Sequence, residues 1–322
     1  LCFPLVFYVA FVYGLLPGMF LTLVAYYYFI KYTKEKHWYQ LVISALSINL
    51  AILLIGNNLI HLLAIFAVAV IYFIRNKDWK VIAFILSCVF LMSASKSVIT
   101  NYYEVKSQKE IAEGVPKITW IAMGMQEGER EAGWWNRFNY DIMPEEEYDT
   151  KRITEISKTS MKQRLNVFRD NPKYAFDFYQ RKYENQFIEP TFQSLLVTAP
   201  QRNFSNETTL EKIRDFFVKQ IYFNHTHTVL EFIMKVFQVF VYLFTFVFAV
   251  VMYKRKNEFF AIIPIAFIGG TLFNMIWEAK SRYIFPYFVF LIPLAAYGLV
   301  IVRNKIKEYK KLKEEKDEKS TI

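Results

Sequence analysis

Three charged side chains, Glu278, Lys280 and Arg282, stand together between two long apolar runs of the chain. At helical rise, the runs 259–276 and 283–302 are each about 27 to 30 Å long, which matches the hydrocarbon thickness of a bilayer. The charged cluster therefore falls at a membrane face, where a cation costs less than the roughly 2.5 to 3.5 kcal/mol of the bilayer centre.

This cluster could bind an anionic lipid. Arg282 and Lys280 could neutralise a lipid phosphate, while Glu278 orients the guanidinium or contacts a sugar hydroxyl. If the segment is helical, Glu278 and Arg282 share a face at i,i+4 and Lys280 points elsewhere. The alternative is a turn whose cations extend to lipid headgroups, and the segment alone does not decide between the two readings.

The distribution of polar residues indicates the class of protein. Hydrophobic residues make up 54% of the chain, and the polar residues are gathered in blocks, as in multi-span membrane proteins. Gly14 and Pro17 separate the apolar residues 1–12 from the next run, so we expect a partial crossing at the start and a longer natural protein. Seven further crossings are predicted, at 13–30, 39–56, 59–74, 80–95, 229–253, 259–276 and 283–302.

The net charge of +10 is unevenly placed. Residues 96–228 hold 19 basic and 19 acidic side chains, so the excess lies in short loops between the predicted crossings and in the tail after Val302. The positive-inside rule places the basic loops at 31–36, 75–80 and 254–258 and the tail in the cytoplasm, whereas the Glu278 to Arg282 cluster falls on the outer side. We therefore predict a multi-pass plasma-membrane protein with a cytoplasmic C-terminus, with residues 96–228 outside, and no nucleic-acid partner.

The predicted fold is an α-helical polytopic membrane protein with a small α-rich (α+β) extracytoplasmic domain inserted between its spans. One buried strand is expected at 118–123, which is rich in β-forming residues. Helices are expected at 97–113, from Pro144 to 169, at 173–187 and at 208–221. The predicted domains are 1–100 (first part of the membrane bundle), 101–227 (external domain), 228–303 (last three spans) and 304–322 (basic tail).

Other residues of the chain could contact a sugar, bind a metal or cap backbone groups. Trp134, Trp135 and Asn136 could stack on and hydrogen-bond a sugar, although the tryptophans could equally anchor the loop at the membrane interface. His225 and His227 lie two apart and do not share a helical face, so no metal site is predicted there. In the tight turn between two crossings, Asn57, Asn58 and His61 are expected to cap backbone groups. Cys2 and Cys88 lie in apolar runs and imply neither a disulfide nor a metal site.

A family resemblance accompanies these residues. The segment from Trp277 to Tyr287 resembles the E-x-x-x-R-Y-x-x-P element that precedes a late span in bacterial polytopic glycosyltransferases of the C superfamily. These enzymes are relatives of the dolichyl-phosphate-mannose protein mannosyltransferases. The segments 120–125, 133–136 and 190–192 are similar to parts of a Gram-positive bacterial subset, so the resemblance spans roughly residues 100–300.

The resemblance implies transfer of a sugar from a polyprenyl-phosphate donor to a glycan or lipid acceptor at the outer face of the membrane. An acceptor hydroxyl attacks the anomeric carbon with help from a carboxylate base, and the lipid phosphate leaves. Such a base is expected in a first external loop that precedes Leu1, so no catalytic residue is assigned. A divalent cation is compatible with such a site, but the sequence indicates no cofactor. The predicted substrate-binding residues are Glu278, Lys280, Arg282, Tyr283, Trp134, Trp135 and Asn136.

Two alternatives stay open. A polysaccharide polymerase or ligase that acts on lipid-diphosphate glycans would also have many spans and external cationic residues, and an acidic residue in an upstream external loop would favour the transferase instead. A transporter or lipid-binding assembly factor of the envelope is the non-enzymatic alternative. Transporters usually carry polar residues at the bilayer midplane, and few are present within these runs.

Overall fold

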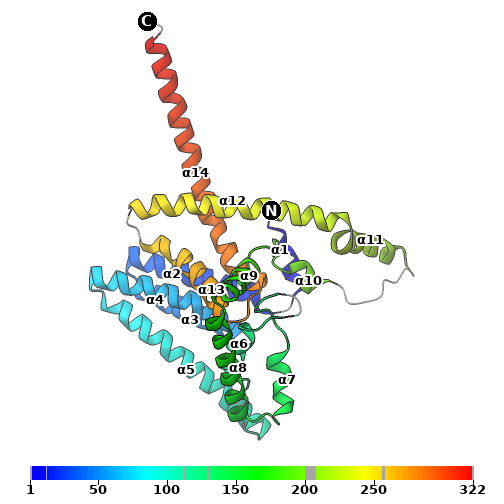
Figure 1. Ribbon diagram of the computed structural model, residues 1–322. Helices are drawn as coiled ribbons and strands as arrows, with labels where there is room; N and C mark the ends of the chain where they lie inside the picture. Colours follow the sequence, from blue (N-terminus) through cyan, green and yellow to red (C-terminus); the bar gives the residue numbers. More distant parts are fainter. Residues whose placement is uncertain are drawn as a thin grey trace.

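The computed structural model describes residues 2–11, 13–111, 114–128, 131–199, 208–255 and 258–320 (Figure 1). This described part contains no β-strand and only one isolated antiparallel bridge, between Glu127 and Ala132. Its elements are α1 (Phe3–Phe7), η1 (Tyr8–Ala10), α2 (Leu15–Glu35), α3 (Trp38–Leu54), η2 (Gly56–Asn58), α4 (Leu59–Asn76), α5 (Trp79–Ser107), α6 (Lys117–Gly124), α7 (Phe138–Glu145), α8 (Thr150–Asp170), α9 (Pro172–Glu184), α10 (Ser194–Thr198), α11 (Thr209–Phe223), α12 (His225–Arg255), η3 (Glu258–Ala261), α13 (Ile262–Ile276) and α14 (Ser281–Ser320).

Long apolar helices form a bundle in which α2 packs along α3, α12 along α14, and α13 against both α4 and α14. Close approach in the bundle depends on small residues. A Cβ at Gly298 of α14 would lie 2.0 Å from the carbonyl oxygen of Phe244 in α12, and one at Gly270 of α13 would lie 2.5 Å from the ring of Tyr287. The helix α14 crosses the bundle and extends beyond it toward the C-terminus (Figure 1).

Within the described residues, five helices are long and apolar enough to cross a membrane, against seven predicted crossings. They are Gly56–Asn76, Trp79–Ser107, His225–Lys254, Phe259–Ile276 and Ser281–Glu315. The other two predicted crossings are also helices, α2 and α3. The helix α3 is apolar but only 17 residues long, and consecutive tyrosines and a lysine dilute the apolar character of α2. Their crossing of the membrane stays a prediction.

The predicted break near residue 14 is confirmed. Gly14 has a positive φ of 58°, and α2 begins at the next residue with Pro17 in its first turn. Before the break, α1 and η1 are short and do not form a span of their own. Tyr8 of η1 is buried, donates its hydroxyl to the carbonyl of Phe192 and packs its ring 4.7 Å from that of Phe285.

The short basic turns lie at one end of the bundle. Lys36, which follows α2, pairs with Asp78 at 3.1 Å, and Tyr32 donates a 2.7 Å hydrogen bond to the same carboxylate. The turn before α13 reaches this end as well, because Phe259 packs its ring 5.7 Å from that of Tyr72 in α4. The common placement agrees with the charge pattern of the sequence, while the side of the membrane stays a prediction.

The predicted strand at 118–123 is wrong. Residues 117–124 form the helix α6, whose buried Thr119, Ala122 and Met123 follow the i, i+3, i+4 spacing of a helical face. Local β-propensity favoured a strand, but no partner strand lies beside it. The side chain of Thr119 instead meets Ser157 of α8 at 2.9 Å.

The helix start predicted at Pro144 is also wrong. Pro144 lies in the last turn of α7, and α8 begins at Thr150, where Asp149 accepts hydrogen bonds from the backbone N–H groups of Lys151 and Arg152. An aspartate N-cap is a stronger start signal than a nearby proline. The predicted helices at 173–187 and 208–221 correspond to α9 and α11, and Thr208 closes a capping box with Glu211. The helix expected at 97–113 is the end of α5, which stops at Ser107.

The helices α6 to α10 gather at one end of the bundle (Figure 1). A second, small core joins α8 and α9 to the end of α6, with Met125, Phe168 and Phe178 buried at its centre. Arg164 of α8 crosses this core. Its Nε donates to the carbonyl of Met125 at 2.7 Å, and its guanidinium lies 4.8 Å from the ring centre of Phe168. The arrangement fixes the C-terminal end of α6 in place.

Candidate functional site

The charged segment lies in a short link between two apolar helices. The helix α13 ends at Ile276 and α14 begins at Ser281, so residues 277–280 are not helical. Trp277 stacks on Phe273 and Trp120, with ring centres 5.3 and 6.2 Å apart. The backbone N–H of Ala279 donates a 3.0 Å hydrogen bond to the carbonyl of Gly133. Aromatic stacking and a backbone bond thus hold the link against α6 and the loop that follows it.

Two glycines let α6 and the loop after it approach this link closely. A Cβ at Gly124, the last residue of α6, would lie 2.5 Å from the carbonyl oxygen of Trp277. Gly133 has a positive φ of 67° and supplies the carbonyl that binds the link. These two glycines therefore set how closely the link packs against this part of the chain.

Glu278 is nearly inaccessible, with 2% of its surface exposed. Its Oε1 forms an ion pair with the ammonium of Lys280, and its Oε2 accepts a 2.9 Å hydrogen bond from the hydroxyl of Tyr283. The expected i,i+4 pair of Glu278 with Arg282 is wrong, because the link is not helical before Ser281. Glu278 therefore positions Lys280 and Tyr283, and its expected pair with Arg282 does not form.

Arg282 lies in the first turn of α14 among aromatic rings. Its guanidinium is 5.3 Å from the ring centre of Tyr283, 5.9 Å from that of Phe11 and 6.0 Å from that of Tyr13. Its Nε is buried and has no hydrogen-bond partner among the described residues. A guanidinium is always charged and carries five donors, so this one has hydrogen-bonding capacity to offer a ligand.

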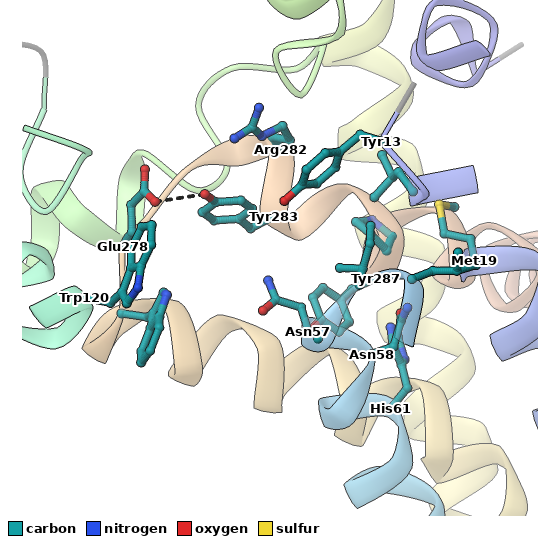
Figure 2. A pocket seen from close by; sticks show the side chains of 16 residues that line it. Tyr13, Met19, Asn57, Asn58, His61, Trp120, Glu278, Arg282, Tyr283 and Tyr287 are labelled. Atoms are coloured by element: carbon teal, nitrogen blue, oxygen red, sulfur yellow. Dashed lines mark hydrogen bonds between the residues drawn. The ribbon is translucent and has the colours of Figure 1, made fainter. Parts of the chain in front are cut away.

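A cavity of about 430 Å³ opens beside the link (Figure 2). Figure 2 shows Arg282 and Tyr13 along one rim, with Asn57 and His61 opposite them and the Glu278–Tyr283 hydrogen bond at the side. Most of the lining is apolar or aromatic. These residues are Tyr13, Leu15, Met19, Leu54, Ile55, Trp120, Trp277, Tyr283, Pro286 and Tyr287. The cavity thus combines an apolar interior with a cationic rim.

The turn between α3 and α4 closes the far side of this cavity. Asn58 donates from Nδ2 to the carbonyl of Ala51 at 2.8 Å, so its expected capping role is confirmed at the end of α3. His61 does not cap the backbone as expected. It meets the hydroxyl of Tyr26 through Nδ1 at 2.6 Å, and its ring stacks on Tyr287 with centres 4.7 Å apart.

A second cavity, of about 280 Å³, also has Arg282 in its lining. It is lined by Trp134, Trp135, Asn136, Arg137, Gln193, Leu196, Val197, Lys280 and Arg282. The ammonium of Lys280 lies 5.5 Å from the ring centre of Trp134 and 6.0 Å from that of Trp135. The structure therefore brings the two sequence-predicted groups together around this cavity, and Arg282 belongs to both cavities.

Asn136 lines the second cavity, but its amide is already engaged. Its Nδ2 donates to Gln126 at 2.7 Å, and its Oδ1 accepts from the backbone N–H of Phe138 at 3.1 Å. The indole of Trp135 similarly donates to Asn139 at 3.1 Å. Asn136 thus shapes the loop that presents the two tryptophans to this cavity.

Lys182 of α9 is a site residue that the sequence analysis missed. Its side chain is fully buried, and its ammonium donates to the carbonyl of Gly124. Burial lowers the pKa of Lys182 to about 7, although the negative charge of Glu278 acts in the opposite direction. Phe178 and Lys182 are spaced i,i+4, so the apolar period of α9 could have shown that this lysine faces inward.

Glu189 is the second residue that was missed. Its carboxylate accepts hydrogen bonds from the backbone N–H of Thr191 at 2.8 Å and from the hydroxyl of Ser281 at 3.1 Å. It also accepts from the backbone N–H of Gln193. Phe192 and Gln193 both have positive φ, of 52° and 60°, which is uncommon for side chains of this size. Glu189 thus holds a strained turn against the start of α14 and directs Gln193 to the second cavity.

No cluster of three or more His, Cys, Asp or Glu side chains that could hold a metal is present among the described residues. His227 is engaged with Glu231 on the same helix, with 3.2 Å between Nε2 and the carboxylate oxygen.

A family model described as "Conserved hypothetical integral membrane protein" matches residues 2–300 of the chain. No curated protein and no solved structure matches it. The match supports the membrane class of the protein. The chemistry of the protein depends on the two cavities and the residues that line them.

Proposed function

The chain belongs to this family of integral membrane proteins, and on that premise we propose that it transfers a sugar from a polyprenyl-phosphate-linked donor to a cell-surface glycan or lipid acceptor. One observation carries the proposal: Arg282, whose buried Nε has no partner among the described residues, lines both an apolar cavity and an aromatic, polar one. A polyprenyl-phosphate sugar has the same order of parts, with an anion between an apolar chain and a sugar.

The first cavity suits the start of an isoprenoid chain. Its volume of about 430 Å³ and its lining of Leu15, Met19, Pro286 and aromatic rings favour an apolar ligand. The rest of a longer chain would extend into the surrounding lipid. In this arrangement the phosphate lies at the rim, where Arg282 can donate two parallel hydrogen bonds and Lys280 adds a second positive charge.

The second cavity suits the sugar. The C–H faces of a pyranose pack on aromatic planes, and the rings of Trp134 and Trp135 line this cavity. The buried amide of Gln193 and the ammonium of Lys280 can bind hydroxyl groups. Asn136 supports the loop from behind through its bonds to Gln126 and Phe138.

The chemistry follows from these positions. The acceptor oxygen forms a bond to the anomeric carbon as the bond from that carbon to the phosphate oxygen breaks, and a carboxylate base takes the proton of the acceptor hydroxyl. Negative charge grows on the departing phosphate, where Arg282 and Lys280 stabilise it. Glu278 is engaged by Lys280 and Tyr283, so it orients these groups and does not serve as the base.

The proposed topology follows the charge pattern. The link 277–280 lies at the end of α13 and the basic turn before η3 at its beginning, so the two occupy opposite faces if α13 crosses the membrane. Basic short turns on the cytoplasmic side would put the site at the outer face of a plasma membrane, with the C-terminal tail inside.

Binding of a polyprenyl phosphate tests the phosphate contact directly. Protein in lipid nanodiscs is titrated with a short-chain polyprenyl phosphate and, separately, with the corresponding alcohol. A hydrogen bond to a charged group contributes about 1.5 to 3 kcal/mol, so Arg282→Ala should weaken binding of the phosphate about 10- to 150-fold. The alcohol should bind the variant and the wild type alike.

The matched control is Arg169→Ala. Arg169 is exposed and pairs with the neighbouring Asp170 at 3.1 Å, away from both cavities. Its replacement should leave phosphate binding unchanged. In native membranes, Arg282→Ala should also abolish release of polyprenyl phosphate from a glycosylated donor while expression and membrane insertion persist. Unchanged binding and release in Arg282→Ala would disprove the assignment of Arg282 as the phosphate contact.

A further inference from the structure

Two lysines, Lys280 and Lys182, lie near Glu278, and the proposed mechanism gives Lys182 no role. A carboxylate that is 2% exposed requires a nearby positive charge, because an uncompensated buried charge is strongly destabilising. Lys280 supplies one charge through a direct ion pair. Lys182 packs beside the same link, since its Cε lies 2.6 Å from the position of a Cβ at Gly133, whose carbonyl binds Ala279, and its ammonium and Glu278 attract each other.

Lys182 cannot itself reach a ligand. It is fully buried and lines neither cavity, and its ammonium donates to the carbonyl of Gly124. The space around it is filled, since a Cβ at Gly133 would lie 2.6 Å from its Cε. The carbonyl of the same Gly133 binds the N–H of Ala279 in the link. The side chain of Lys182 is thus held in place beneath the link.

Lys280 differs in each of these respects. Its side chain is 12% exposed and lines the second cavity beside Trp134 and Trp135. Rotation about its flexible side chain can move the ammonium from Glu278 toward an anion held by Arg282. If Lys280 were the sole partner of Glu278, that movement would leave a buried carboxylate without a counter-charge.

We propose that Lys182 is a positioning residue that keeps Glu278 compensated when Lys280 turns from Glu278 to the phosphate of the bound ligand. The inference rests on the proposed function and adds a regulation of that site by protons. With Lys280 turned away, the carboxylate acts on Lys182 without a competing cation. Lys182 then holds its proton more tightly, so binding of the anion is coupled to protonation of a lysine that the anion never touches.

The charged groups around Lys182 support this coupling. On the link, Glu278 and Lys280 face it. From α9 itself, Arg181 points to Glu127 and Asp177. Arg164 of α8 is engaged with the carbonyl of Met125, and α13 carries no titratable side chain. Because burial lowers the pKa of Lys182 to about 7 in the free protein, a rise in this pKa on binding falls in an accessible pH range.

The sign of the pH dependence follows from linkage. Below pH 7 Lys182 is protonated before and after binding, so affinity is constant there. Between its free and bound pKa values the lysine must take up a proton on binding, so affinity falls by up to about tenfold per pH unit as the pH rises. Above the bound value the affinity is constant again and low.

Calorimetry of the wild-type protein in nanodiscs tests the proposal. The ligand is a glycosylated polyprenyl phosphate, because a phosphate diester does not titrate here whereas a monoester has a second pKa of about 6. Titrations at pH 8 in two buffers of different ionisation enthalpy should show uptake of up to about one proton per ligand, and the affinity should fall between pH 7 and pH 9. Binding without proton uptake and without a pH slope would overturn the role of Lys182.

A variant of Lys182 tests which group takes up the proton on ligand binding. Lys182→Met keeps the length of the side chain without its charge, and it should bind more weakly at pH 6 and lose the slope between pH 7 and pH 9. A retained slope would assign the proton to another group and overturn the proposal. If this variant does not fold, the wild-type proton count still decides. Failure of the wild type to bind any polyprenyl phosphate would refute the proposed function as well, which separates the two failures.

Discussion

Two lysine–carboxylate pairs lie at opposite ends of the helix bundle, one in the turns beside α2 and α5 and one in the link between α13 and α14, and they have different consequences. At one end, Lys36 and Asp78 are 3.1 Å apart with side chains 46% and 16% exposed. At the other, Lys280 and Glu278 form an ion pair with side chains 12% and 2% exposed. The residue types are equivalent, so burial and neighbours distinguish a pair that joins two turns from a pair that can hold a ligand.

The hydrogen-bond partners of the two carboxylates, Asp78 and Glu278, also differ. Asp78 accepts a hydrogen bond from Tyr32 and another from the backbone N–H of Lys80, so it caps α5 and needs no lysine for that role. Glu278 has no backbone donor among its hydrogen bonds and depends on Lys280, Tyr283 and the charge of Lys182. Removing a group from the second pair should therefore have the larger effect on stability.

The largest effect is expected for Glu278→Ala. Breaking a buried ion pair by removing one partner costs about 3 to 5 kcal/mol. Lys182 then lacks its counter-charge, so its pKa should fall further below 7 and the protein must bury an unpaired ammonium or release its proton. Since a proton is released more readily at high pH, the loss in unfolding free energy should be larger at pH 6 than at pH 9. Denaturation in detergent micelles at pH 6 and at pH 9 measures this loss of unfolding free energy.

Asp78→Ala is the matched control for this variant. It should lose the cap of α5, worth about 0.5 to 2 kcal/mol, with no larger loss at pH 6 than at pH 9. Equal losses in the two variants, or the same pH dependence in both, would contradict the distinction drawn between the two ends of the bundle.

A smaller effect is expected for Gly133→Ala. The left-handed φ of 67° adds about 1 to 2 kcal/mol of strain, and the new Cβ would lie 2.6 Å from Lys182, so crowding adds more. The total loss of unfolding free energy should be roughly 2 to 4 kcal/mol. Gly114→Ala is the control, because Gly114 has φ 75° but no atom within 4 Å of the added Cβ. A loss no larger than that of Gly114→Ala would mean that Lys182 is not held tightly.

The contrast between the two ends also shows what sequence patterns could predict. Hydrophobic runs and charge placement predicted the membrane class and the shared position of the basic turns, because both follow from local composition. The break at Gly14 was predictable for the same reason, since one residue sets the backbone there. The two shortest or least apolar helices, α2 and α3, are the ones that length and composition alone do not establish as crossings.

The candidate site was predictable only in part. Glu278, Lys280, Arg282 and Tyr283 are adjacent in sequence, and the structure places Trp134 and Trp135 beside them. Which residue Glu278 binds depends on where α14 begins, and the helical assumption gave the wrong partner.

Lys182 and Glu189 were not predictable by proximity in sequence. Each lies some ninety residues before the link in the chain, and each reaches it only through the packing of the helices between α5 and α11. The amphipathic period of α9 was the one local signal that pointed to Lys182. Nothing local marked Glu189, because its partners depend on the left-handed turn at Phe192 and Gln193.

Tyr283→Phe should have a moderate effect. It removes the hydroxyl that donates to Glu278 at 2.9 Å and keeps the ring that lies against Arg282. A hydrogen bond to a charged group contributes about 1.5 to 3 kcal/mol, and the lower value is expected here because Lys280 still pairs with the carboxylate. Thermal unfolding measures the change. A loss as large as that of Glu278→Ala would show that the tyrosine, and not the lysines, holds the carboxylate in place.

The smallest effect is expected for Lys36→Ala. An exposed ion pair contributes about 0 to 1 kcal/mol and is screened by salt, and Asp78 keeps its bonds to Tyr32 and Lys80 in the variant. The packing of the lysine over the ring of Tyr72, 4.4 Å from its centre, is lost as well but adds little at an exposed position. Unfolding at low and high salt should therefore differ by less than about 1 kcal/mol between variant and wild type. A loss near 3 kcal/mol that persists in high salt would place the end with the basic turns in the same energetic class as the link, and the comparison that separates the two pairs would fail.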